Sequence, residues 1–187
     1  MSTLFVNNLN TASGTDITVA AGKTIKAPGS VVQFAYRDPT GSYATQVSAS
    51  STSYTNSNIS VTITPKYANS VILIGGDFQF GLSASFNNYA YLTLKRVISG
   101  GATTDLGHVT SGGDNYGIIQ RGGTSSYEWD SSTFTFPDKP NTTSAVTYQV
   151  WFRNNGGSGT MYMGWTSSSN NTFTHNGIFL HAVEIAQ

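Results

Sequence analysis

The 187-residue chain contains no cysteine, which excludes disulfide bonds and thiolate metal sites. No apolar run approaches the ~20 residues of a membrane-spanning helix. The first residues also lack the basic-then-apolar pattern of a secretory signal peptide. We therefore expect a chain that is neither inserted in a membrane nor exported through one.

Charged side chains are scarce. They make up 10% of the chain, against about 25% in ordinary soluble domains. Nine basic and nine acidic residues cancel to a net charge of zero, and the basic residues are scattered along the chain. Because nucleic-acid binding needs a basic stripe that follows the phosphates, we do not expect a nucleic-acid partner.

Signatures of catalysis are also lacking. The sequence has no Gly-x-Ser-x-Gly, no His-Glu-x-x-His and no phosphate-binding loop. Glu128 and Asp130 stand two apart on one face of a predicted strand. Glycosidases hold their two carboxyl groups ~5–9.5 Å apart across a cleft, and neighbours on one solvent face provide no cleft. We therefore expect a non-enzymatic protein with no catalytic site and no cofactor.

The chain has three histidines, His108, His175 and His181, and no spacing among them that favours a metal site. His181 is in step with Phe179 and Val183, so it is predicted to face a core or a trimer axis. A structural role is the expectation, as for other hydrogen-bonded or packed histidines, and no metal is expected.

The pattern that is present is that of β-structure. No window has helical spacing of apolar residues, whereas residues 59–63, 89–96 and 146–153 alternate with a period of two. Gly75-Gly76 interrupts a long apolar run and predicts a bulge or bend. With about eight to ten short strands, the chain is predicted to be all-β, a β-sandwich or jelly roll. Further strand candidates are residues 31–36, 47–54, 71–82, 104–109, 118–119, 127–136 (ending at Pro137), 161–165 and 178–185.

The first 29 residues differ from the rest, because their short apolar patches are too small to close a core. Isolated strand pairs are marginal in water. We therefore expect residues 1–29 to be an anchoring and trimerisation segment, ordered by neighbouring copies or by the virion, and residues 30–187 to be the jelly-roll domain. The apolar residues expected to anchor the segment are Leu4, Phe5, Val6, Leu9, Ile17, Val19 and Ile25.

The opening TLFVNNLNTASGTDITVAAGKTIKAPGSVVQ resembles the leader of short structural proteins of tailed bacteriophages, especially marine phages and cyanophages. The C-terminal GIFLHAVEIA resembles the last core strand of trimeric jelly rolls of the tumour-necrosis-factor and complement C1q type. The resemblance implies a homotrimeric virion protein, such as a tail or head fibre, bound to other virion proteins through residues 1–29. A capsid decoration protein is the alternative within this class, and a soluble lectin or carbohydrate-active enzyme is the alternative outside it.

A Gly-rich segment, residues 112–123, is predicted to form a distal recognition surface. Aromatic faces stack on sugar rings while polar side chains bond the hydroxyls, so a host glycan or surface protein is the expected partner. The alternative is a solvated hairpin with its tyrosine packed on the sheet. Trp129, Trp151 and Trp165 are left open between core, interface and ligand contact. The residues proposed for recognition are Tyr116, as the stacking platform, with Asp114, Asn115, Gln120 and Arg121.

Overall fold

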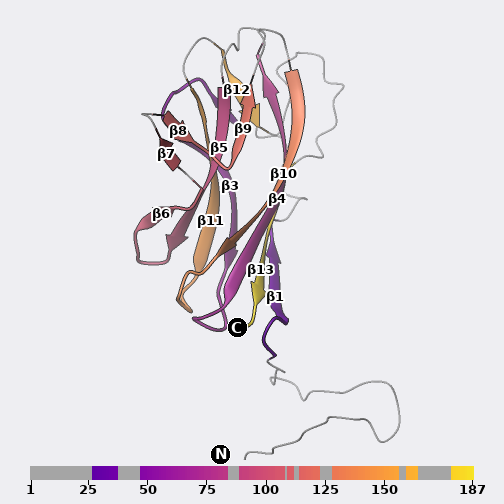
Figure 1. Cartoon of the computed structure of the whole chain (residues 1–187), viewed down its shortest axis with the longest axis vertical. Helices are drawn as coiled ribbons and strands as arrows, with labels where there is room; N and C mark the ends of the chain where they lie inside the picture. Colours follow the sequence, from indigo (N-terminus) through magenta and orange to yellow (C-terminus); the bar gives the residue numbers. More distant parts are fainter. Residues whose placement is uncertain are drawn as a thin grey trace, which may run out of the picture.

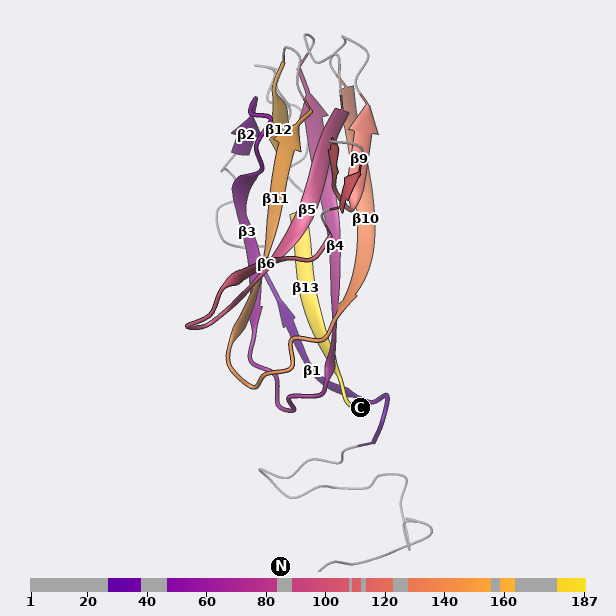
Figure 2. The same cartoon turned by 60° about the vertical axis from the view of Figure 1, so that its left-hand side comes forward.

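The computed structural model describes residues 27–37, 47–83, 89–107, 109–111, 114–122, 128–155, 159–163 and 178–187. Every regular element in these ranges is a β-strand, which confirms the all-β prediction. Two sheets pack face to face (Figures 1 and 2). Figure 1 also shows that the described chain begins and ends at the same end of the sandwich. There, the backbone N–H of Gly29 donates to the carbonyl of Ala186 at 2.8 Å.

The first sheet, sheet A, is six-stranded. Strand β4 is its centre. It pairs along one edge with β10, and along the other with β13 and then β12, all antiparallel. β1 lies outside β13, and β2 lies outside β12. The strands of sheet A are β1 (Val31–Tyr36), β2 (Val47–Ala49), β4 (Val71–Leu82), β10 (Glu128–Asp138), β12 (Met161–Met163) and β13 (Ile178–Ile185).

The second sheet, sheet B, is five-stranded and runs in the order β3-β11-β5-β6, with β9 beside the first part of β5. A separate two-stranded hairpin joins β7 to β8. The strands of sheet B are β3 (Thr55–Ile63), β5 (Tyr89–Ile98), β6 (Thr103–Asp105), β9 (Ile119–Gly122) and β11 (Val146–Asn154), and the hairpin strands are β7 (Val109–Ser111) and β8 (Asp114–Tyr116).

The strand order is that of a jelly roll. The chain pairs with itself from its ends inward: β1 with β13, β3 with β11, β4 with β10, and β5 with β6 and β9. β2 with β12 belongs to the same nested series, in sheet A like β1 with β13, and from there on the pairs alternate between the two sheets, so one long antiparallel ribbon is rolled into a sandwich. The predicted fold class is therefore confirmed, while the division at residue 29 stays a prediction.

The core lies between the sheets and follows the alternation visible in the sequence. On β11, Val146, Tyr148, Val150 and Phe152 are buried, whereas Thr147, Gln149 and Trp151 between them are only partly covered. Sheet A contributes its own alternating set from β4, β12 and β13. The larger buried side chains of sheet A are Ile72, Ile74, Phe78, Leu82, Met161, Met163 and Leu180.

Three sequence expectations were wrong in detail. Of the bulge or bend expected at Gly75-Gly76, the bulge does not occur, because β4 keeps a continuous register with β10 and β13 through both glycines. The strand expected over residues 104–109 is split into β6 and β7 by a bend at residues 106–107. β10 continues through Pro137 to Asp138, which an edge strand allows since proline then costs no ladder hydrogen bond.

Candidate interaction surfaces

The outer face of sheet A is apolar along β1, β13 and the first part of β4, whereas β10 is polar there. On β13, Leu180, Ala182 and Glu184 point into the sandwich, so Phe179 and His181 point outward. The register places outward-facing side chains of β1 and β4 beside them. Four of these side chains are strongly exposed: Val31 63%, Tyr36 56%, Phe34 53% and Phe179 39%. We call the set the apolar face: Val31, Phe34, Tyr36, Val71, Leu73, Phe179, His181, Val183 and Ile185.

His181 lies at the centre of the aromatic part of this face. Its ring centroid is 5.6 Å from that of Phe34 and 5.2 Å from that of Phe179. Its Nδ1 is buried and has no hydrogen-bond partner. Burial therefore lowers the pKa of His181, because the charged form is the one that loses solvation. The residue does not enter the sandwich core; whether it faces a trimer axis stays a prediction.

The apolar face carries little charge. Among the described outward-facing side chains of β1, β4, β10 and β13, Asp77 is the one ionisable group apart from His181 and Tyr36. Contiguous exposed apolar surface of this kind is unusual on a monomer, and it makes this face a candidate interaction surface.

The outer face of sheet B is polar by contrast. The hydroxyls of Thr62 and Thr147 lie 2.8 Å apart across β3 and β11. Lys95 places its ammonium 4.1 Å from the centroid of the Trp151 ring and 3.3 Å from the carboxylate of Asp105. Trp151 therefore lies on the outside of sheet B and not in the core, and a lysine covers one face of its ring. The side chains of Trp129 and Trp165 lie outside the described residues.

One long side of the sandwich is bordered by two edge strands. β1 and β3 lie along one side, and β10 of sheet A and β9 of sheet B lie near each other along the other (Figure 2). Apolar side chains here pack against the core but keep part of their surface exposed. We call this the open side; its apolar residues are Ile98, Leu106, Ile118, Phe134 and Phe136.

A third exposed feature lies at the end of the sandwich opposite Ala27 and Gln187, where β5 begins (Figure 1). Tyr89 is 46% exposed and pairs with Gly122 of β9. A Cβ on Gly122 would lie 3.3 Å from Cε1 of Tyr89, so the ring rests against bare backbone. Gln120, Arg121 and Gly122 are all exposed.

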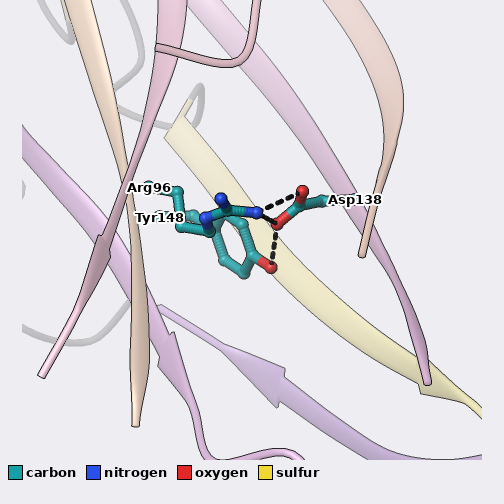
Figure 3. Close-up of polar contacts among 3 residues, drawn as sticks. All are labelled: Arg96, Asp138 and Tyr148. Carbon is teal, nitrogen blue, oxygen red and sulfur yellow. Dashed lines mark hydrogen bonds and ion pairs between the residues drawn. The ribbon is translucent and has the colours of Figure 1, made fainter. Parts of the chain in front are cut away.

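Two polar clusters lie buried in the sandwich, and the first joins the two sheets. In Figure 3, Arg96 of β5 and Tyr148 of β11 both reach across to Asp138 of β10. Nη1 of Arg96 donates to both carboxylate oxygens, at 2.7 and 3.0 Å, and the Tyr148 hydroxyl donates to Oδ2 at 2.8 Å. Burial, then the neighbouring carboxylate, raises the pKa of Tyr148 far above its ordinary value, so the phenol stays a donor.

The second cluster surrounds Glu184 of β13, which is fully buried. Its carboxylate accepts from the backbone N–H groups of Lys66 and Tyr67, from the Ser70 hydroxyl at 2.7 Å and from the Gln33 amide at 2.6 Å. Although burial alone would raise the pKa of Glu184, these donors hold it below its ordinary value. The cluster ties β1 and the β3–β4 loop to β13.

The structure places the predicted recognition residues only in part. Asp114, Asn115 and Tyr116 form β8, but their side chains lie outside the described part, so the Tyr116 platform stays a prediction. Gln120 and Arg121 are exposed on β9, and their role in recognition stays a prediction. The predicted anchoring residues Leu4, Phe5, Val6, Leu9, Ile17, Val19 and Ile25 all lie outside the described residues.

Sequence reasoning missed Tyr89 and the apolar face. The alternation of Tyr89 with Ala90 marked a strand, but only the pairing with β9 shows that Tyr89 lies beside Gln120. Within the described ranges, no three acidic or histidine side chains gather as metal ligands. In the same ranges, no helix is long and apolar enough to cross a membrane.

No protein-family model and no curated protein matches the sequence. Among solved structures, the chain is similar to a chain in the structure of infectious bursal disease virus Gx strain. The sequence identity is 12% and the TM-score 0.32, over 92% of this chain and 42% of that one. The chain thus spans less than half the length of that neighbour, and a likeness this low carries no argument about function.

Proposed function

We propose that the protein is a non-enzymatic virion component, a homotrimeric tail or head fibre of a tailed bacteriophage. The observation that carries the proposal is the apolar face, which exposes three aromatic rings on one side of an otherwise polar sandwich. The phage-like opening of the sequence and the jelly-roll strand order support the same assignment.

The two apolar surfaces suggest how copies associate. In the proposed arrangement, the apolar face of one copy packs against the open side of the next, where Phe134 and Phe136 are only partly buried. Such a contact joins two different surfaces of the same chain, so it closes into a ring when the rotation between copies suits. Fully burying a Phe side chain contributes ~1.5–3 kcal/mol, so covering the exposed rings of this face favours association, against the loss of translational and rotational freedom that every association carries.

Analytical ultracentrifugation of the full chain tests the association. Wild type is expected to sediment as a trimer, and Phe34→Ser is expected to shift it to monomer with unchanged β circular dichroism. Tyr89→Ser is the matched control, because it removes a comparably exposed ring from sheet B. A monomeric wild type would refute the trimer, and equal dissociation by both variants would refute the assignment of the interface to the apolar face.

The virion assignment needs a separate experiment. Mass spectrometry of purified particles is expected to detect the chain, and its absence from the particles would exclude a structural role. Particle imaging then separates the two members of this class: a fibre projects as a three-fold rod, whereas a decoration protein lies flat over capsomer junctions.

A further inference from the structure

We propose that Tyr89, Gln120 and Gly122 form a saccharide-binding ledge at the end of the sandwich away from Ala27. The inference deepens the proposed function and rests on it for its biological meaning, since it names the class of molecule that the exposed end of the virion protein binds. The binding itself needs only a single copy of the folded chain.

The first step is the platform. The Tyr89 ring rests against the backbone of Gly122, and 46% of the residue remains exposed to solvent. Because Gly122 has no side chain, nothing rises beside the ring from the partner strand at that position. A sugar ring has an apolar face of C–H groups, and an aromatic ring held in this way offers that face a flat surface at low entropic cost, since Tyr has two side-chain torsions.

The second step concerns the groups that adjoin the Tyr89 ring and fix its strand. Tyr91 lies beside Tyr89 with 6.3 Å between ring centroids. The guanidinium of Arg153 lies 4.8 Å from the Tyr91 ring centroid, and it donates to Thr52 and Asn155 at 3.1 and 2.8 Å. The backbone N–H of Asn155 in turn donates to the carbonyl of Tyr89 at 2.8 Å. Tyr89 therefore adjoins buried, hydrogen-bonded groups on the same face of sheet B, and a platform fixed in this way lowers the ordering cost of binding.

The third step is the polar neighbour. Gln120 pairs with Tyr91 and is exposed, so it lies diagonally across from Tyr89 on the same face of sheet B. Diagonal neighbours in an antiparallel pair are about 7–8 Å apart, which brings a side-chain amide to the edge of a hexose stacked on Tyr89. An amide both donates and accepts, as a pair of sugar hydroxyls requires.

The chemistry at the ledge differs from that of the apolar face. Tyr36 is exposed to a similar extent, but its outward neighbours include Phe34, at 5.8 Å between centroids, and His181 of the paired strand. That surface suits protein packing, whereas the ledge combines one ring with polar groups. Three ledges in a trimer would raise weak single-site affinity by avidity.

Saturation-transfer NMR of the full chain tests the ledge, with methyl glycosides of glucose, galactose, mannose and N-acetylglucosamine as probes. At least one glycoside is expected to receive saturation at its ring C–H protons. Tyr89→Ala is expected to weaken binding roughly tenfold, the effect of losing one aromatic contact. Tyr89→Phe is expected to retain binding, and Gln120→Ala to weaken it.

The control is Tyr36→Ala, which removes a comparably exposed ring from the other sheet. It is expected to leave glycoside binding unchanged while it weakens association in the ultracentrifuge, and Tyr89→Ala is expected to do the reverse. A wild-type chain that binds none of the four glycosides overturns the ledge, as does unchanged binding by Tyr89→Ala or equal loss in Tyr36→Ala. A monomeric wild type that still binds glycoside through Tyr89 overturns the trimer but not the ledge.

Discussion

Gly75 of β4 lies directly beneath the imidazole of His181 of β13, its register partner. A Cβ placed on Gly75 would overlap the Cε1 and Nε2 atoms of that ring. The next glycine, Gly76, faces the other way, into the core, where a Cβ would approach the rings of Phe78 and Phe134 at 2.5 and 2.8 Å. The glycine pair therefore makes room for aromatic rings on both sides of one strand.

The two glycines should differ in their tolerance of alanine. In Gly75→Ala the His181 ring can swing outward, because it lies on the outer face, and the expected loss of stability is about 1 kcal/mol. In Gly76→Ala, Phe78 is fully buried and cannot leave, so the expected cost is about 1–3 kcal/mol. Urea unfolding measures the free energy of unfolding of both variants. A larger loss of stability for Gly75→Ala than for Gly76→Ala would contradict this account of the glycine pair.

A double-mutant cycle isolates the contact on the outer face. Because His181→Ala removes the ring that the new methyl group would displace, the cost of Gly75→Ala should fall to near that of an ordinary strand substitution. The same His181→Ala background should leave the cost of Gly76→Ala unchanged, since that residue contacts other rings. Identical costs of Gly75→Ala in both backgrounds would show that the imidazole is not the obstacle.

The Asp138 cluster predicts an unequal response to removal of its members. Tyr148→Phe removes one hydrogen bond to a carboxylate and should cost about 1.5–3 kcal/mol. Asp138→Ala leaves the Arg96 guanidinium without its carboxylate, with the two side chains only 16% and 8% exposed, and should cost about 3–5 kcal/mol. Denaturant titration checks the order, and a smaller effect for Asp138→Ala would mean that the cluster contributes little.

The sequence alone could predict the strands but not the reason for the glycine pair in β4. Alternation predicted β3 and β11, because each buries one face and leaves the other partly exposed, and it predicted β5 although residues 90–94 of that strand are buried on both faces. Gly75-Gly76 was misread as a bulge, since a glycine needed for the space of a distant ring has the same local signature as one needed for backbone geometry. The obstacle is the ring of His181, more than a hundred residues away in the sequence.

The candidate surfaces were less predictable from the sequence, because they depend on how distant strands pair. A period of two shows that Phe179 and His181 share a side, but it does not say which side faces the core. That depends on sheet pairing: sheet A packs its other side on sheet B, so the aromatic side is left outward. Tyr89 and Gln120 become neighbours only through the β5–β9 register, which no local pattern contains.

A local backbone prediction concerns Asn58, which has a positive φ of 59° beside the register shift between β3 and β11. Its backbone N–H donates to Oδ1 of the Asn56 side chain at 2.8 Å. Asn58→Gly should be close to neutral because glycine adopts this conformation freely, whereas Asn58→Val should cost about 1–2 kcal/mol. Thermal unfolding of the two variants checks the difference, and equal stability would contradict strain at this position.

The last prediction concerns acid stability, through Glu184. Its folded-state pKa is lowered, so near its unfolded pKa of about 4.3 the unfolded chain binds more protons than the folded one. Unfolding therefore takes up a proton, and the stability that this carboxylate contributes is fully present above that pH and lost as the pH falls through the folded-state pKa. Glu184→Gln keeps the shape but cannot titrate, so it should lower stability at neutral pH and flatten the acid limb of the stability curve.

His181, whose pKa is also lowered, contributes a separate loss of stability that begins near its unfolded pKa of about 6.5. Urea unfolding from pH 7 to pH 3 separates the two windows, with His181→Gln as the control that alters only the upper one. An acid limb of unchanged slope in Glu184→Gln would assign the acid sensitivity to other carboxylates.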